Sequence, residues 1–376
     1  MRPQNTDTFV AREELLLRNR IFETFFEAEA ARLAEACHEV SRRFLGGGRL
    51  LAFGNGSAAT DAQHVSVEFV HPVIVGKRAL PALDLGPDFE RRLPVLLHPD
   101  DMVMGFAFPE ADDSVERALS TARERGALTF SLTGEAGEYS FAPPDRNPFV
   151  VQEVFEVLYH VLWETVHVYF EHREQGHDVG NSSFLYPFFG KGEQSLEEVV
   201  EEVQRSMLQK VQEVNRLRAA ASESEAAALS DIAVAIVERL ERGGKLIAFG
   251  NGGSATDAND LVADCLDPPP GFGTIPAVSL SSEPANITAI AHARPEDVAI
   301  GISTSGGSAN ILSALAEARN RGLLTVGIVG YDGGRIVGER LEDHAVVVRS
   351  DSIPRIQEVQ ASIYHVLRGL LERRKA

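Results

Sequence analysis

The stretch Leu50-Leu51-Ala52-Phe53-Gly54-Asn55-Gly56 returns as Leu246-Ile247-Ala248-Phe249-Gly250-Asn251-Gly252, displaced by 196 positions. In each copy a helical pattern comes before the apolar run, and a second helical pattern follows the glycine turn. The order helix, strand, glycine turn, helix is typical of an α/β unit whose turn lies at the carboxyl end of a strand. The sequence therefore predicts two diverged copies of one domain.

Both copies continue as alternating strands and helices. Short apolar runs bounded by charge or glycine predict strands at 102–106, 128–132, 298–302, 324–329 and 345–348. The clearest helical patterns between them cover 114–125 and 309–321. This alternation predicts a parallel sheet in each half, joined by right-handed crossovers. We place the first domain at 1–172, a linker at 173–194 and the second domain at 195–376.

Composition excludes several classes of function. The 376 residues suffice for two domains of ordinary size. A formal charge of −19 argues against nucleic acid or an anionic membrane as a partner, because association would begin with repulsion. Only two cysteines, Cys37 and Cys265, are present, which excludes a disulfide scaffold or a thiolate metal cluster. The polar N-terminus and the lack of a long apolar run predict a cytoplasmic protein.

A hydroxyl-rich loop, Ser303-Thr304-Ser305-Gly306-Gly307-Ser308, follows a predicted strand and opens a predicted helix. Its hydroxyls, its glycine-flanked backbone amides and the helix N-terminus together suit a phosphate. A serine N-cap is the alternative, but it accounts for one hydroxyl rather than four. The aligned stretch of the first copy carries Glu110, Asp112 and Asp113. We expect an ordinary acidic helix start there, in a copy that has lost its phosphate loop.

The first copy also carries a candidate metal site. His64 and Glu68 are one helical turn apart, and Gln152 and His160, eight apart, share one face of the helix predicted to close this half. Imidazole, carboxylate and amide oxygen make a divalent-cation site, with Zn²⁺ as the leading candidate. Taken alone, His64 fits a surface or packed core histidine better than a ligand.

The second copy replaces part of this set. Asp260 and Asp264 stand where His64 and Glu68 were, while Gln357 and His365 keep the separation of eight. Retention of the Gln and His pair in both copies indicates a role in function. A structural role for His365 at a helix interface explains the same retention equally well.

Together these motifs resemble the SIS (sugar isomerase) domain, and within it the phosphoheptose isomerases that act on sedoheptulose 7-phosphate. The resemblance covers nearly the whole chain as two copies. In the second copy it rests on 250–257, 303–306, 332–334 and 355–359. In the first copy it rests on 54–56, 61–64, Glu68, 152–154 and His160.

The resemblance implies a flavodoxin-like αβα sandwich for each copy, and an aldose-ketose interconversion through an enediol(ate). By position, the zinc ligands look like His64, Glu68, Gln152 and His160. Glu68 then resembles the catalytic carboxylate and His160 its partner acid or base. The phosphate clamp resembles Ser303, Thr304, Ser305 and Ser308, and the further substrate-binding positions are Asn55, Asn251, Gly253, Ser254, Glu283, Gln357 and His365.

The chemistry of such a reaction agrees with this assignment. Moving a proton between adjacent carbons needs a base whose pKa burial raises toward neutrality, and an electrophile that holds the developing oxyanion. A carboxylate beside a metal or an imidazole supplies both functions. A phosphate clamp remote from the reacting carbons adds binding and orientation.

Neither copy alone carries the full set of site residues. The first copy lacks the hydroxyl-rich loop and has Ala58 where the second has Ser254, and the second copy lacks the His and Glu pair. We therefore expect a composite site that joins the first-copy set to the second-copy loop. The expected ligand is a small sugar phosphate, and two chains are expected to form a homodimer that is a pseudo-tetramer of SIS domains. A non-catalytic sugar-phosphate-binding regulator or assembly protein is the main alternative, and an amino-sugar isomerase or etherase is a weaker one.

Overall fold

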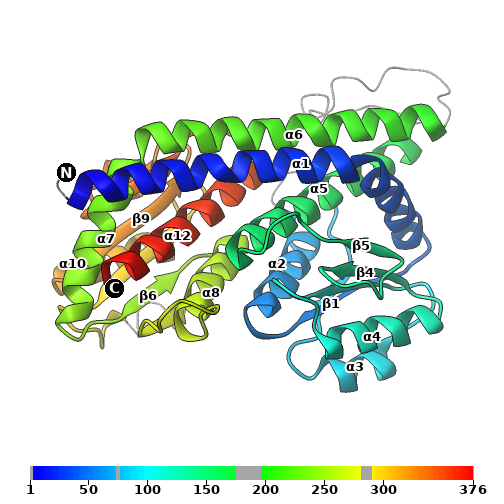
Figure 1. Cartoon of the computed structure of the whole chain (residues 1–376), viewed down its shortest axis with the longest axis horizontal. Helices are drawn as coiled ribbons and strands as arrows, with labels where there is room; N and C mark the ends of the chain where they lie inside the picture. Colours follow the sequence, from blue (N-terminus) through cyan, green and yellow to red (C-terminus); the bar gives the residue numbers. More distant parts are fainter. Residues whose placement is uncertain (1–2, 73–76, 175–195, 281–289, 376) are drawn as a thin grey trace. The chain divides into compact units, whose positions relative to one another are not determined.

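The computed structural model describes residues 3–72, 77–174, 196–280 and 290–375. Within them the chain forms two five-stranded sheets in which every strand pair is parallel (Figure 1). The predicted linker at 173–194 lies almost wholly outside the described residues, as does Glu283. The two sheets confirm the predicted α/β class with parallel sheets.

The first sheet has the strand order β2-β1-β3-β4-β5. Its register places Leu50 opposite Met102, and Met102 opposite Leu128. The order 2-1-3-4-5 is the flavodoxin-like one, in which ligands bind at the carboxyl ends of the strands. Its strands are β1 (Leu50–Gly54), β2 (Ala82–Asp84), β3 (Met102–Phe106), β4 (Leu128–Leu132) and β5 (Tyr139–Phe141).

The second sheet repeats this order as β7-β6-β8-β9-β10. Here β6 pairs with both β7 and β8, as β1 pairs with β2 and β3 in the first sheet. The flavodoxin-like prediction is therefore confirmed for both copies. Its strands are β6 (Leu246–Phe249), β7 (Ala277–Leu280), β8 (Val298–Ser303), β9 (Leu324–Gly330) and β10 (His344–Val348).

Helices connect and flank these strands (Figure 1). In the first copy they are α1 (Pro3–Leu45), the short η1 (Gly56–Ala58), α2 (Ala59–Val70), α3 (Phe89–Leu96), α4 (Asp113–Glu124) and α5 (Pro148–Glu174). In the second copy they are α6 (Leu196–Ser224), α7 (Ala226–Glu241), α8 (Gly253–Leu266), α10 (Ala309–Asn320), α11 (Gly334–Gly338) and α12 (Ile353–Lys375).

Alternate residues of each central strand enter different cores. On β6, Leu246 and Ala248 belong to one apolar cluster, whereas Ile247 and Phe249 belong to another. Both faces of this strand are thus buried, which explains why its sequence is an unbroken apolar run. In the first sheet Phe53 stacks on Phe89 of α3 at a centroid distance of 4.5 Å.

The described chain divides into two compact units that do not follow the repeat boundary. The first-sheet unit comprises Arg20–Asn147 and Val154–Glu213. The second-sheet unit comprises Met1–Asn19, Pro148–Glu153 and Val214–Ala376. The division at 172 and 195 stays a prediction, but the early part of α1 and the first turns of α5 belong to the second-sheet unit. In that unit Asn19 and Asn215 each donate an amide N–H to the other's backbone oxygen.

A buried aspartate directly precedes the equivalent strand in each sheet, β3 in the first and β8 in the second. Asp101 accepts hydrogen bonds from the Arg49 backbone and guanidinium, and from the His98 backbone. Asp297 likewise accepts from the backbone and ammonium of Lys245, and from the Arg294 backbone. Burial would raise the pKa of both carboxyls, but these donors outweigh it and lower both. The two copies have therefore kept this framework while their sites diverged.

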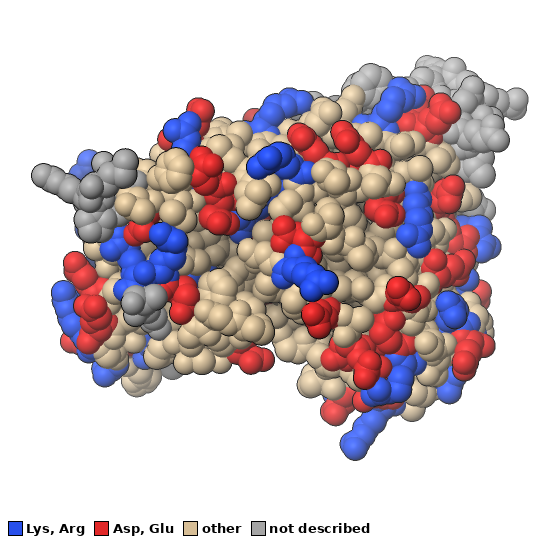
Figure 2. Space-filling model, viewed as in Figure 1, with Lys and Arg blue, Asp and Glu red and all other residues tan. Residues whose placement is uncertain are grey.

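On the face drawn in Figure 2, acidic and basic side chains are interspersed. Over the described ranges, no helix has both the length and the apolar run needed to cross a bilayer.

Candidate functional site

The hydroxyl-rich loop lies at the carboxyl end of β8, as expected. Gly306 has φ +60°, and its N–H donates to Ser303 Oγ at 3.1 Å. A Cβ at Gly306 would overlap the backbone oxygen of Gly333, so the loop packs directly on the turn before α11. Only glycine fits this position, because it tolerates the left-handed conformation and offers no atom to clash.

Two loop hydroxyls remain available beside the N-terminus of α10. Ser308 is the N-cap residue but its side chain makes no capping hydrogen bond. Ser305 is exposed and lines a cavity of about 700 Å³. The other lining residues are Tyr331, Asp332, Arg349, Ser350 and Asp351. Sequence reasoning missed Arg349, although its place just after β10 could have indicated a residue at this edge of the sheet.

An amide pair joins the glycine turn to the start of α10. Asn251 and Asn310 donate to each other's side-chain oxygens at 2.8 and 2.9 Å. The predicted substrate positions Gly253 and Ser254 are buried in the first turn of α8. Asn251, Gly253, Ser254 and the loop therefore belong to one compact unit, at neighbouring strand ends.

The first copy fills the corresponding place with its own carboxylate. Asp112 caps α4 by accepting from the backbone N–H of Ser114 and of Val115. The Ser114 hydroxyl donates to the same Asp112 oxygen, and Asn55 donates to Ser114 Oγ at 2.7 Å. The helix start predicted from the acidic residues is present. Asn55, predicted as a substrate-binding residue, makes its hydrogen bond within this cap.

In the first-sheet unit, α2 and α5 bring together two histidines and two glutamates. His64, Glu68, Glu156 and His160 are each at most 4% exposed. His64 Nε2 lies 3.8 Å from Glu68 Oε1, and the rings of His64 and His160 are 5.3 Å apart. One ligand atom each from His64, Glu156 and His160 lies within 4.8 Å of the others. Two imidazoles with a carboxylate form a donor set that fits Zn²⁺.

Two details of this first-copy cluster differ from the predicted ligand set. The Gln152 amide donates to Asp260 Oδ1 at 2.6 Å, and Gln152 belongs to the second-sheet unit. Glu156, which sequence reasoning missed, supplies an oxygen one turn before His160. Its spacing of four from both Gln152 and His160 could have indicated it.

In the second-sheet unit, His365 lies among three carboxylates. Its Nδ1 is 3.0 Å from Glu153, and its Nε2 is 3.3 Å from Asp260 and 3.4 Å from Asp264. Phe149 stacks on the imidazole at 4.9 Å. Burial alone would lower the pKa of His365, but the three carboxylates beside it raise it well above the ordinary value.

The carboxylates around His365 have pKa values that are shifted in opposite directions. Burial would raise the pKa of Glu153, but Arg18 and His365 hold it at about 2. Arg18 Nε donates to both Glu153 oxygens at 2.9 Å, and the Ser362 hydroxyl donates at 2.6 Å. Burial and the neighbouring Asp260 raise the pKa of Asp264 to about 7.

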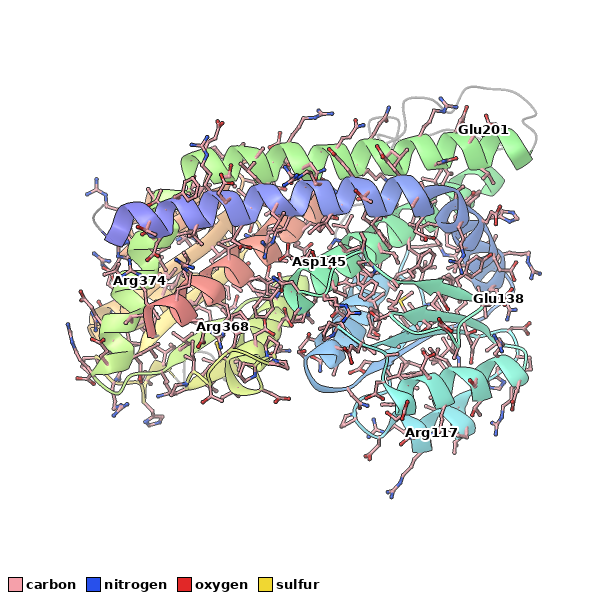
Figure 3. The ribbon with its side chains drawn as sticks, in the orientation of Figure 1. Arg117, Glu138, Asp145, Glu201, Arg368 and Arg374 are labelled. Atoms are coloured by element: carbon pink, nitrogen blue, oxygen red, sulfur yellow. The ribbon has the colours of Figure 1, made fainter. Side chains whose placement is uncertain are left out.

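The remaining predicted residue, Gln357, is 2% exposed on α12. Further along this helix Arg368, labelled in Figure 3, donates to the backbone oxygens of Asp264 and Gly273. It also pairs with Glu372 at 3.0 Å. These contacts hold α12 to α8 and to the loop that follows α8.

Comparisons with known proteins indicate the family. A model of the SIS domain family matches residues 211–267. The phosphoheptose isomerase of Pelobacter propionicus is 39% identical over 164 residues, which are 39% of this chain and 84% of that protein. The phosphoheptose isomerase of Solidesulfovibrio magneticus is 40% identical over 153 residues, 35% of this chain and 72% of that protein.

A solved structure extends the likeness in fold. A putative phosphosugar isomerase from Silicibacter pomeroyi superposes with a TM-score of 0.63 at 14% identity, over 97% of this chain and 98% of that one. This likeness shows the fold alone. The two phosphoheptose isomerases are each matched over more than two thirds of their own length, at 39% and 40% identity. This identity shows kinship. The chain therefore belongs to the SIS-domain isomerase family that includes the phosphoheptose isomerases.

Proposed function

We propose that this protein is an aldose-ketose isomerase that converts sedoheptulose 7-phosphate to a D-glycero-heptose 7-phosphate through an enediol(ate). The observation that carries the proposal is kinship with phosphoheptose isomerases, joined to a glycine and hydroxyl loop at a helix N-terminus. The coarser function, isomerisation of a sugar phosphate, follows from the same relatives.

The loop after β8 suits the phosphate ester. Ser305 is exposed to the adjoining cavity, and the Ser308 hydroxyl is not used for capping. The N-terminus of α10 adds favourable potential for an anion, and the glycines let backbone amides approach it. Binding energy gained at the phosphate orients the carbons that react at the other end of the substrate.

The first-copy cluster suits the proton transfer. Glu68 removes a proton from the carbon beside the carbonyl and returns it to the neighbouring carbon. His160 exchanges a proton with the substrate oxygen that becomes charged in the enediolate. Both side chains are nearly fully buried, so water is excluded from them. A Zn²⁺ ion held by His64, His160 and a glutamate supplies Lewis-acid polarisation of the carbonyl when bound.

Two finer parts of the proposal stay predictions. One is that a working site combines the first-copy cluster with the second-copy loop. The other is that two chains associate as a homodimer. A composite site shared between two chains is tested by mixing Glu68→Gln and Ser305→Ala chains at a substrate concentration at which each alone turns over slowly, because subunit exchange restores activity only where complementary parts come from different chains.

The deciding experiment is turnover by the purified full chain. We expect conversion of sedoheptulose 7-phosphate to aldose, followed by product separation, and no conversion of unphosphorylated sedoheptulose. Stripping with a chelator is expected to abolish turnover, and Zn²⁺ to restore it. Saturable sugar-phosphate binding without turnover, in metal-loaded protein, would contradict the isomerase proposal and favour a sugar-phosphate-binding regulator.

A further inference from the structure

The second copy contains a group of metal-ligand side chains that the proposed reaction does not use. Asp260 and Asp264 project from α8, one turn apart, and His365 faces them from α12. All three are at most 3% exposed. We propose that Asp260, Asp264 and His365 bind a divalent transition-metal ion of the Zn²⁺ type, in addition to any ion of the first-copy cluster.

The orientation of the imidazole is the first argument. His365 Nδ1 lies 3.0 Å from Glu153 Oε1, and an ionised carboxylate can only accept, so this nitrogen carries the proton. Arg18 and Ser362 fix Glu153 in place. In the neutral imidazole, which is the form that binds a metal ion, Nε2 is then the nitrogen whose lone pair faces the two aspartates. A carboxylate behind a histidine ligand is the usual support of a metal-bound imidazole.

The distances are the second argument. His365 Nε2 lies 3.3 Å from Asp260 Oδ2 and 3.4 Å from Asp264 Oδ2. A charged N–H···O bond spans about 2.7–2.9 Å. Ligand atoms placed about 2.0–2.1 Å from a tetrahedral Zn²⁺ ion lie roughly 3.3–3.4 Å apart. The two Nε2–oxygen distances thus match the edge of a tetrahedral coordination site more closely than a charged hydrogen bond.

The third argument is that two buried ligand atoms lack a hydrogen-bond partner among the residues described. In the described part of the chain, His365 Nε2 and Asp264 Oδ2 make no hydrogen bond, although both atoms are buried. Asp260 is by contrast held by Gln152, which donates to Oδ1, and by Tyr364, which donates to Oδ2. Each carboxylate oxygen has a second lone pair, so Oδ2 can still ligate a cation.

Charge and ligand type select the ion. Arg18 pairs with Glu153 and Arg368 pairs with Glu372. Within the described ranges His365 is therefore the cation left beside the two aspartates, and a divalent ion that displaces its Nε2 proton would neutralise both carboxylates. An imidazole nitrogen beside two carboxylates favours a transition metal over Mg²⁺ or Ca²⁺, which prefer oxygen alone. Such an ion would tie α8 to α12 and, through Glu153, to the start of α5, and it would stabilise the second-sheet unit.

Two aligned variants test the assignment. The variants are Asp264→Asn and Glu68→Gln, which changes the residue 196 positions earlier. Wild type and both variants are stripped of metal with a chelator, loaded with Zn²⁺ as full chains and desalted. Their metal content is then measured by mass spectrometry. We expect Asp264→Asn to lose one ion per chain relative to wild type. Glu68→Gln is expected to retain that ion. Loading with Co²⁺ should show a tetrahedral absorption component that Asp264→Asn lacks and Glu68→Gln keeps. Equal metal content and equal spectra in wild type and Asp264→Asn would overturn the proposal.

A measurement on the wild-type chain covers the case in which Asp264→Asn fails to fold. Hydrogen exchange of the stripped protein is compared with and without Zn²⁺. The amides of α8 and α12 are expected to gain protection on loading, because the ion joins these helices. Unchanged protection in both helices would overturn the proposal, whatever the enzyme's activity.

Discussion

The starts of α4 and α10 occupy the same place in the repeat but have opposite chemistry. At α4 the Asp112 carboxylate accepts from two backbone N–H groups of the first turn. At α10 the N-cap Ser308 makes no side-chain capping bond, and a glycine loop precedes it. A helix N-terminus attracts an anion in either case. The first copy supplies that anion from its own Asp112, whereas the start of α10 in the second copy has no side-chain carboxylate cap and, by our proposal, receives a ligand.

This comparison indicates how a duplicated domain can divide its labour. The first copy keeps imidazole and carboxylate on α2 and α5 while its anion place is filled. By our proposal the second copy keeps the anion site at the start of α10, while its aligned α8 carries two aspartates. If the two copies share one working site, each can lose one function as long as the other retains it.

The largest expected effect concerns the first copy. Glu68→Gln removes the proposed base without changing its size, and kcat is expected to fall by about 10²–10⁴-fold, because general-base catalysis contributes a factor of this order. The binding constant for the sugar phosphate should stay within a few-fold, since the phosphate loop is intact. Steady-state kinetics and calorimetry measure the two quantities.

The control for this variant is Glu90→Gln. Glu90 is exposed and pairs with Arg117 on the surface, so the same chemical change there should leave kcat unaltered. A Glu68→Gln enzyme with wild-type kcat would show that the first-copy cluster does not carry the proton transfer.

The next effect concerns the anion place of the second copy. Ser305→Ala removes an exposed hydroxyl that faces the cavity beside α10. We expect KM for the sugar phosphate to rise by roughly 10–100-fold, since a hydrogen bond to a charged group contributes about 1.5–3 kcal/mol. Gly306→Ala should have at least as large an effect, because its Cβ would overlap the Gly333 oxygen and displace the loop. Unchanged KM in both variants would place the phosphate elsewhere.

The sequence was sufficient to predict the central strands of both sheets. Strands at 102–106 and 128–132 have the predicted bounds, and β8 and β9 each extend one residue further. These strands are buried on both faces, so their apolar runs are unbroken. The strands that sequence reasoning missed are β2, β5 and β7, which are short, lie at or toward sheet edges and alternate less clearly. Helix α3 was missed because Pro94 interrupts its pattern.

The candidate site was only partly predictable, for a physical reason. The loop at 303–308 and the pair His64 and Glu68 are local in sequence, so spacing alone places them on one turn or one helix face. The contact of Gln152 with Asp260 joins positions 108 residues apart. No local pattern indicates such a contact, because the tertiary packing of α5 and α8 decides it.

A third effect tests what the two copies share rather than where they differ. Asp101→Asn and Asp297→Asn each weaken hydrogen bonds to a buried carboxylate, and each is expected to lower the free energy of unfolding by about 1.5–3 kcal/mol at neutral pH. Both carboxyls have a pKa below the usual 3.8. Their contribution is therefore present above pH 3.8 and is lost as pH falls through the folded-state pKa.

Urea unfolding at several pH values measures this contribution. The difference between wild type and either variant should begin to shrink near pH 3.8 and should disappear only below the folded-state pKa, and it should be similar for the two copies. A difference that grows on acidification would contradict the hydrogen-bond arrangement described for these aspartates.

The smallest effect returns to the two helix starts. Asp112→Ala removes a carboxylate that accepts from Ser114 and Val115, and it should lower stability by about 1 kcal/mol, as loss of an N-cap does. Ser308→Ala removes no side-chain capping bond, so its stability should stay within a few tenths of a kcal/mol of wild type. Its substrate binding should weaken instead, whereas Asp112→Ala should bind sugar phosphate as the wild type does. Equal stability losses in the two variants would mean that Ser308 caps α10 as Asp112 caps α4, and the second helix start would then lose its claim to be an open anion site.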